Sequence, residues 1–172
     1  MSYLLLRVKS EAGSLIQISC ATLSDAEALA NLAEEMNQHY GATETDPLDL
    51  RIRQITEALF SNPRSAYALL AWDDGEPVGF AAYSFLWPAV GLTTSLYLKE
   101  LYVARKARRK GVGKLLMQHL HMLAAERGCS RLEWQTDLDN LDAQRFYADL
   151  GFPVDESKLF YRVQGDDLRA IR

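Results

Sequence analysis

The segment 104–116, with the sequence ARKARRKGVGKLL, places five cationic side chains within seven positions and then two glycines, Gly111 and Gly113, at the start of an apolar run. The apolar spacing after Gly111 predicts a helix, and a helix N-terminus presents unpaired N–H groups and the positive end of a dipole. Glycine lets an anion approach the backbone closely. The segment therefore favours an anionic partner, and the candidates are a nucleic acid, an acidic membrane and a small phosphorylated ligand. The alternative is that the cations contact only water.

The composition narrows this choice. Lys and Arg number 19 against 23 Asp and Glu, for a formal net charge of −4, so the molecule as a whole repels polyanions. Neither a stacking platform nor a basic stripe extends beyond this turn, which argues against nucleic acid. No run of about 18 apolar residues and no export signal is present, so we expect no membrane partner and a cytoplasmic protein. A small anion is the remaining ligand class.

The cysteines and histidines suggest no metal site. Cys20 and Cys129 are the only cysteines, they form no CxxC pair, and they do not cluster with the histidines. We expect reduced thiols and no metal. His39, His119 and His121 have no companions at ligand spacing, so we expect them at the surface or at an interface.

The frame of the basic loop is Arg108-x-x-Gly111-x-Gly113. It lacks the Gly-Lys-Ser/Thr ending of nucleotide-triphosphatase loops and the GxGxxG of dinucleotide folds. A solvated basic turn with ordinary glycines remains the alternative interpretation.

The elements that must position this loop follow from periodicity and turn signals. We expect one continuous domain with a core over about 15–163, a first strand ending near Ala21, and a helix capped by Ser24 with Glu27 three residues on. A second helix ends at Asn62 and Pro63. An antiparallel hairpin follows around the Asp-Asp-Gly-Glu turn, then a strand over 95–103 with Leu96, Leu98, Glu100 and Tyr102 on one face. Four further elements complete the prediction: a helix over 111–127 with Gly128 as C-cap, a strand over 130–136, a helix over 140–151, and a last strand over 157–164.

Two motifs carry a resemblance to a known family. Arg108, Gly111 and Gly113 match the Gln/Arg-x-x-Gly-x-Gly/Ala motif of the GNAT superfamily of N-acetyltransferases. About thirty residues on, a second segment resembles its Asn-x-x-Ala-x-x-Phe-Tyr-x-x-x-Gly-Phe pattern, through Asn140, Ala143, Phe146, Tyr147, Gly151 and Phe152. The resemblance implies an α/β fold of the GNAT type. Its central, mostly antiparallel sheet has six to seven strands, splays between strands 4 and 5, and is flanked by about four helices.

The resemblance also implies acetyl-coenzyme A as co-substrate. In that family the pantetheine arm pairs with the fourth strand, here at Leu101, Tyr102 and Val103, and Asn140 adds a hydrogen bond. The basic cluster would hold the phosphates, including the 3′-phosphate. The residues implied are Arg108, Arg109, Lys110, Gly111, Val112, Gly113 and Lys114. Arg109 stands where glycine is common in the family.

Acetyl transfer to an amine needs a proton acceptor. An alkyl ammonium with a pKa of about 10.4 is neutral in only about one molecule in 10³ at pH 7, a handicap of about 4 to 5 kcal/mol. Glu100 is the candidate base and would accept the proton through a water molecule; a solvent-facing or salt-bridged strand carboxylate is its alternative role. Tyr147 occupies the family's acid position and would protonate the departing thiolate, whereas its neighbour Phe146 better suits packing.

The expected activity is acetyl transfer from acetyl-coenzyme A to a primary amine of a small molecule by direct attack in a ternary complex. A protein or peptide amine is the second acceptor class, and a non-catalytic coenzyme A-binding module is the alternative. The segment LYLKELYV is similar to the diamine and polyamine acetyltransferase branch, although Lys99 and Glu100 stand where that branch often has two acids. Dimers are frequent in the superfamily, so a homodimer is compatible with the resemblance.

Overall fold

The computed structural model describes residues 6–9 and 15–169. The chain forms two compact units, one up to Gln135 and the other from Thr136 onward. The sequence prediction of one continuous domain stays a prediction.

The first unit is built on one mixed sheet with the strand order β1-β2-β3-β4-β5-β6. Neighbouring strands are antiparallel from β1 to β5, and β6 joins β5 in parallel. The strands are β1 (Leu6–Lys9), β2 (Leu15–Cys20), β3 (Tyr67–Asp73), β4 (Glu76–Leu86), β5 (Ser95–Val103) and β6 (Arg131–Glu133). The predicted hairpin is confirmed as β3 and β4, whose turn places Asp74 and Gly75 at positive φ.

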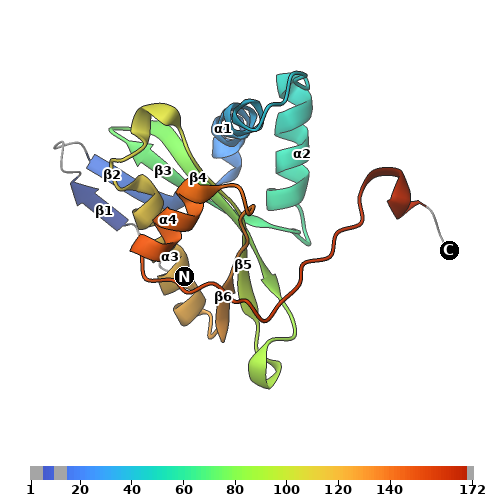
Figure 1. Ribbon diagram of the computed structural model, residues 1–172. Helices are drawn as coiled ribbons and strands as arrows, with labels where there is room; N and C mark the ends of the chain where they lie inside the picture. The colour runs from blue at the N-terminus through green and yellow to red at the C-terminus, as the bar shows by residue number, and fades with distance from the viewer. Residues whose placement is uncertain (1–5, 10–14, 170–172) are drawn as a thin grey trace. The chain divides into compact units, whose positions relative to one another are not determined.

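Helices cover both faces of this sheet. The helices of the first unit are α1 (Ala26–His39), α2 (Leu48–Phe60) and α3 (Val112–Glu126). Short 3₁₀ turns lie at η1 (Leu23–Asp25), η2 (Val90–Leu92) and η3 (Arg105–Ala107). α1 and α2 lie side by side on one face, and α3 lies on the other (Figure 1). The core under α1 and α2 gathers Leu29, Leu32, Leu70, Phe80 and Tyr102.

A β-bulge in β5 changes which residues share a face. Ala82 of β4 pairs with Glu100, but the next residue, Tyr83, pairs with Leu98, so Lys99 is the extra residue of β5. Because adjacent β4 residues point to opposite faces, Glu100 and Leu98 also point to opposite faces. The predicted common face of Leu96, Leu98, Glu100 and Tyr102 is therefore wrong. Glu100 and Tyr102 lie on the face that α1 and α2 cover, and Leu96 and Leu98 lie on the other.

The resemblance implied a sheet whose fourth and fifth strands splay apart. These strands are β5 and β6 in the structure, and the splay between them is confirmed. β6 pairs with β5 only at Ser95, Leu96 and Tyr97. From Leu98 to Val103, the edge of β5 that faces away from β4 forms no strand pairing with any described residue. The strand predicted over 130–136 is accordingly shorter, because only Arg131–Glu133 pairs.

The start of α1 differs from the prediction. The expected capping box at Ser24 and Glu27 lies two residues earlier, at Thr22 and Asp25. The Thr22 N–H and hydroxyl both donate to Asp25 Oδ2, at 2.8 and 2.7 Å. The 3₁₀ turn η1 inserts between the strand and the helix, so the cap precedes that turn rather than α1 itself.

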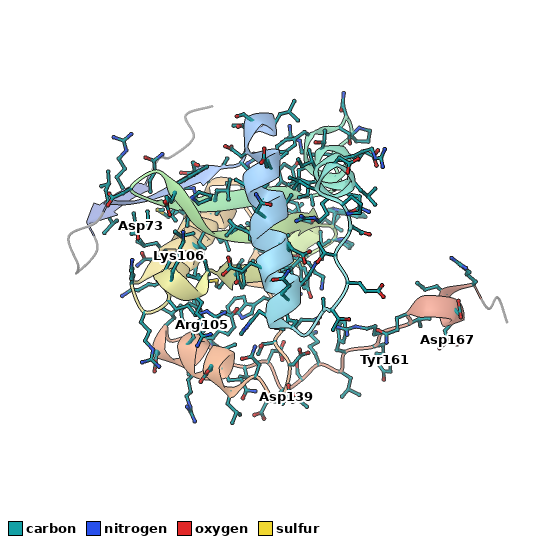
Figure 2. All side chains as sticks on the ribbon, turned by 90° about the horizontal axis from the view of Figure 1, so that it is seen from above. Asp73, Arg105, Lys106, Asp139, Tyr161 and Asp167 are labelled. Atoms are coloured by element: carbon teal, nitrogen blue, oxygen red, sulfur yellow. The ribbon has the colours of Figure 1, made fainter. Side chains whose placement is uncertain are left out.

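The second unit contains α4 (Leu141–Asp149) and the 3₁₀ turn η4 (Gly165–Leu168). Asn140 caps α4, because its side chain accepts a hydrogen bond from the Ala143 N–H at 3.1 Å. The strand predicted over 157–164 is wrong: this segment is not paired with any described strand. Its apolar side chains are exposed, Tyr161 by 84%, so the alternation that predicted a strand has no sheet to pack on (Figure 2).

Candidate functional site

The start of α3 is left open to an anion. Its N-cap is Gly111, at φ 81° and ψ 1°, and no side chain caps the helix. The Leu115 N–H bonds to the Gly111 carbonyl at 3.0 Å, so the amides of Val112, Gly113 and Lys114 precede the first intrahelical hydrogen bond. The first turn contains no acidic residue. These donors and the helix dipole favour a negatively charged ligand.

The backbone just before α3 adopts left-handed conformations at two positions of the Arg-x-x-Gly-x-Gly motif. Gly111 adopts a left-handed conformation, and a β-carbon there would meet no heavy atom within 4 Å, so the space beside it is open. Arg109 also has positive φ, at 62°. An L-residue with a side chain pays roughly 1 to 2 kcal/mol for that conformation. Glycine would adopt this conformation without that cost, in agreement with the glycine that the resemblance led us to expect at this position.

Two cations of the loop form ion pairs within the first unit. Lys106 Nζ lies 2.7 Å from Glu76 Oε2, and Lys110 Nζ lies 3.1 Å from Asp73 Oδ2. The hydrogen bond and charge of Lys106 lower the pKa of the Glu76 carboxyl, and Glu76 in turn raises the pKa of Lys106. Figure 2 shows Asp73, Lys106 and Arg105 on the same side of the molecule. Lys106 and Lys110 are therefore engaged before any ligand arrives.

Three other cations are not engaged in this way. Arg105, Arg109 and Lys114 are exposed and form no ion pair with any residue that the structure describes. Their charges are available to an anion at the start of α3. Arg109 and Lys114 were predicted from the sequence as phosphate-binding residues, and Arg105 was not.

The predicted backbone partners of the pantetheine lie on the part of β5 that β6 does not cover. Leu101 and Val103 are half-buried, and Tyr102 is buried. Gly79 on β4 permits the close approach of the two strands, because a β-carbon there would lie 2.7 Å from the Tyr102 carbonyl oxygen. The open edge leaves main-chain groups of this segment available to an extended ligand.

The Tyr102 side chain joins α1 to the basic loop. Its ring lies 6.0 Å from the guanidinium carbon of Arg108, whose Nε donates to the Val103 carbonyl at 3.1 Å. Burial, and then the nearby Glu35 carboxylate of α1, raise the pKa of Tyr102 to about 12, so the phenol stays protonated at neutral pH. The His39 ring lies 6.5 Å from the Tyr102 ring, centroid to centroid. Sequence reasoning missed Glu35; its i,i+4 spacing to His39 on a predicted helix was the available signal.

Glu100 lies next to Lys99 on β5. The two side chains form an ion pair of 3.4 Å, with Glu100 35% exposed. The bulge turns Glu100 toward the face covered by α1 and α2, and its cross-strand partner is Ala82. Both predicted roles, a base and a paired strand carboxylate, are compatible with this position.

In the second unit, Tyr147 and Phe146 are neighbours on α4. Both are half-buried, and their ring centroids lie 5.1 Å apart. Asn140 is committed to the helix cap, as predicted for one of its two roles. The roles of Tyr147 and Asn140 toward coenzyme A stay predictions.

The histidines divide by burial. His39 and His121 are exposed, as expected, but His119 is 4% exposed inside α3, so the surface prediction for it is wrong. Burial lowers the pKa of His119. Among residues 6–9 and 15–169, no group of three or more His, Cys, Asp or Glu side chains is placed to hold a metal ion. None of the helices described there is long and apolar enough to cross a membrane.

A family assignment follows from comparison with known proteins. Residues 27–152 match the acetyltransferase (GNAT) family, and the chain belongs to it. The match begins in α1 and ends just after α4, so it contains the open start of α3 and both motifs. The family and fold predicted from the sequence are confirmed, and the predicted enzyme class is confirmed at the level of the family.

Two curated relatives are similar in sequence. An aminoglycoside N(6′)-acetyltransferase type 1 of Serratia marcescens is 39% identical over 92 residues, which cover 52% of this chain and 63% of that protein. The D-amino-acid N-acetyltransferase HPA3 of Saccharomyces cerevisiae is 32% identical over 117 residues, covering 66% of this chain and 71% of the relative. Both relatives are named for acetyl transfer to amines of small molecules.

Solved structures share the fold. An integron cassette protein from the mobile metagenome of V. cholerae has a TM-score of 0.83 at 27% identity, covering 90% of this chain and 95% of that one. The aminoglycoside N-acetyltransferase AAC(6′)-Iy, solved in complex with CoA, has a TM-score of 0.71 at 24% identity, covering 89% and 97%.

Proposed function

We propose that this protein is an acetyl-coenzyme A-dependent N-acetyltransferase that acts on a primary amine of a small molecule by direct attack in a ternary complex. The observation that carries the proposal is the uncapped start of α3, with its free amides and open Gly111, beside the unpaired edge of β5. Within a family of acetyltransferases, these two features fit the pyrophosphate and the pantetheine of the co-substrate. Acetyl-coenzyme A would supply the activated acetyl group.

Different residues of the chain bind the pyrophosphate, accept the proton of the amine and protonate the departing sulfur. The amides of Val112, Gly113 and Lys114 hold the pyrophosphate, and Arg105, Arg109 and Lys114 surround it with positive charge. Glu100 accepts the proton that the amine loses, through water, because the neutral amine is the nucleophile. Tyr147 donates its hydroxyl proton to the departing sulfur and regains one from solvent. The new C–N bond replaces the C–S bond, and the products are an amide and the free thiol.

The acidic side of the first unit supports a cationic acceptor. A cavity of about 460 Å³ lies between α1, α2 and their connection, and its charged lining residues are Glu34, Glu44, Asp46 and Arg51, three acids against one base. Glu34 is 9% exposed, and it accepts hydrogen bonds from Thr45 and Gln38. The hydrogen bond from Thr45 lowers the pKa of Glu34, so its carboxylate is charged at neutral pH. Negative potential near the acceptor attracts an alkyl ammonium.

The test is a thiol-release assay of the purified protein with acetyl-coenzyme A and a panel of amines. The panel contains aminoglycosides, polyamines, amino acids and peptide N-termini, and calorimetry measures acetyl-coenzyme A binding in parallel. We expect binding, and turnover with at least one small-molecule amine. Turnover with peptides alone would move the acceptor to the protein class, and binding without turnover on any amine would favour a coenzyme A-binding module.

A further inference from the structure

The cavity between α1 and α2 is separate from the sheet. Its lining comes from these two helices and from residues 44–46 of their connection, and no strand residue that the structure describes contributes to it. Its volume of about 460 Å³ lies within the range of about 300 to 1,000 Å³ that is common for small-molecule sites. The cavity can therefore hold a ligand group that lies apart from the open edge of β5.

Glu34 is a buried carboxylate in the wall of this cavity. It is 9% exposed, and the side-chain amide of Gln38, at 2.9 Å, and the hydroxyl of Thr45 both donate to the same oxygen, Oε1. Glu34 forms no ion pair with any residue in the described part of the chain. Because a buried charge is costly unless it is paired, Glu34 favours a positively charged partner, and Oε2 is left to accept from it.

Arg51 lines the same cavity but does not supply this partner. Its Nε donates to the Asp46 carbonyl at 3.0 Å, and its Nη1 donates to the Ala30 carbonyl at 2.6 Å. These bonds tie α2 to the connection and to α1. Glu44 and Asp46 also line the cavity and, within the described ranges, form no ion pair. Three acids against one base leave the wall negatively charged, so it attracts a cation.

The wall suits an organic ammonium better than a metal ion. Over residues 6–9 and 15–169, no group of three or more His, Cys, Asp or Glu side chains is placed to hold a metal. An alkyl ammonium has three N–H donors, and the lining offers Glu34 and the amide oxygens of Asn37 and Gln54 as acceptors. Ala33 and Ile55 of the lining give the carbon chain of such a ligand an apolar surface.

We propose that this cavity is a subsite for an ammonium group of the acceptor other than the amine that is acetylated, with Glu34 as its charge partner. The acceptor is then a molecule with at least two cationic amines. Glu100, the proposed base, lies on the sheet face that α1 and α2 cover, so both sites lie on the same side of the sheet. This inference rests on the proposed function, because it concerns the acceptor of that reaction.

The first experiment compares amines that differ only in the second cation. At pH 7, 1,4-diaminobutane carries two ammonium groups and 4-aminobutan-1-ol carries one; 1,6-diaminohexane and 6-aminohexan-1-ol form a longer pair. The wild type should acetylate at least one diamine with a kcat/KM about 10- to 100-fold above that of its aminoalcohol, the effect of one hydrogen bond to a charged group. In Glu34→Gln this preference should disappear through KM, with unchanged kcat/KM for the aminoalcohol.

Glu34→Gln keeps Oε1 as an acceptor for Thr45 and Gln38, so it removes the charge and retains these two hydrogen bonds. Glu57→Gln is the matched control, because Glu57 is an exposed carboxylate of α2 that does not line the cavity, and it should keep the wild-type preference. Asp46→Asn should reduce the preference by a smaller factor, since water screens this exposed carboxylate. An equal preference in the wild type and in Glu34→Gln, or an equal loss in Glu57→Gln, would overturn the proposal.

Calorimetry without acetyl-coenzyme A separates this inference from the proposed function. The wild type should bind the preferred diamine, and Glu34→Gln should bind it about 10- to 100-fold more weakly. Binding that depends on Glu34, without turnover of any amine, would refute the proposed function and leave the ammonium site. Turnover of diamines and aminoalcohols with equal kcat/KM would refute the subsite and leave the proposed function. A diamine that activates turnover of the aminoalcohol without being acetylated would identify a separate effector and overturn the assignment to the acceptor.

Discussion

Helices α1 and α3 meet the same physical problem at their starts and solve it differently. Every helix begins with amides that have no partner inside it. The turn before α1 supplies Thr22 and Asp25, whose carboxylate accepts two hydrogen bonds, and Glu27 follows in the first turn. α3 begins at a glycine, with no acid in its first turn and cations around it. No side chain hydrogen-bonds to the first amides of either helix, but the start of α1 has the carboxylates of Asp25 and Glu27 as its counter-charge, whereas the start of α3 has no acidic residue.

The same contrast extends to whole segments of the first unit. Residues 105–114 contain six cations and no carboxylate, whereas residues 34–49 contain five carboxylates and no Lys or Arg. In Figure 2, α1 lies across the strands, with its C-terminal end toward Arg105. A molecule of net charge −4 thus concentrates positive charge in residues 105–114 and negative charge in residues 34–49.

The largest expected effect comes from giving α3 a cap of its own. Gly111→Asp places a carboxylate over the open amides, so we expect coenzyme A affinity to fall by more than about 100-fold, as the carboxylate competes with and repels the phosphates. Calorimetry measures this. Gly128→Asp is the matched control, because Gly128 also has positive φ and open space around a β-carbon, but lies at the other end of α3. Comparable losses in both variants would contradict an anion site at Gly111.

Tyr147→Phe separates turnover from anion binding. The variant should lower kcat by about 100-fold, in the range for loss of a general acid, and leave the Kd of acetyl-coenzyme A unchanged. Steady-state kinetics and calorimetry on the same preparation test both statements. Unchanged turnover would remove the acid role of Tyr147, and Phe146→Leu is the packing control on the same helix.

Glu100→Gln tests whether the carboxylate on β5 accepts the proton of the amine. We expect about a tenfold loss of kcat/KM at pH 7 that is partly recovered near pH 9.5, where more of the amine is already neutral. The measurement is a pH–rate profile of the variant beside that of the wild type. A loss that is equal at every pH would make Glu100 a structural carboxylate paired with Lys99.

Asp25→Ala tests the comparison from the side of α1. Removing this carboxylate leaves the Thr22 donors without their acceptor, so we expect a loss of about 1 kcal/mol in the free energy of unfolding. Urea unfolding measures the loss. Coenzyme A affinity should be unchanged, since the Asp25 carboxylate contacts Thr22 before α1 and not the start of α3; a weakened affinity would show that the two starts are not independent.

The smallest effect is the pH dependence from His119 in the middle of α3. Burial lowers its pKa in the folded protein, so the unfolded chain binds more protons below about pH 6.5 and stability falls there. Between pH 7.5 and 6.0 this contribution is at most about 0.8 kcal/mol for one group. Urea unfolding of His119→Gln should show a smaller fall over this range than the wild type, and His121→Gln, which is exposed, should match the wild type. An equal fall in His119→Gln would assign the pH dependence elsewhere.

Much of the fold was predictable because its signals are local. The Asp-Gly turn, the apolar period of α3 and Gly128 after it each act over a few residues, and each was confirmed. The bulge at Lys99 was not predictable, since it depends on the register of β5 against β4. The strand prediction for 157–164 failed for a related reason: alternating apolar residues form a strand only if the edge of another strand is available for pairing.

The candidate site shows the same division. Gly111 and Gly113 predicted an anion site from the sequence, and the structure confirms the left-handed turn at Gly111 and the uncapped helix start there, whereas anion binding itself stays a prediction. The partners of Lys106 and Lys110 were not predictable, because Glu76 and Asp73 come from β4 and β3. Charge counting treats the whole cluster as available to a ligand, whereas the fold uses Lys106, Lys110 and part of Arg108 to secure the loop.

The short pairing of β6 has a consequence for how this protein behaves without its co-substrate. An open strand edge is a template for a foreign strand, and natural proteins protect such edges with bulges and lysines. β5 has both at Lys99, midway along its strand and just where the pairing with β6 has ended. The open edge that would admit a pantetheine would also favour self-association, and the charge of Lys99 and its bulge disfavour the pairing of a foreign strand there.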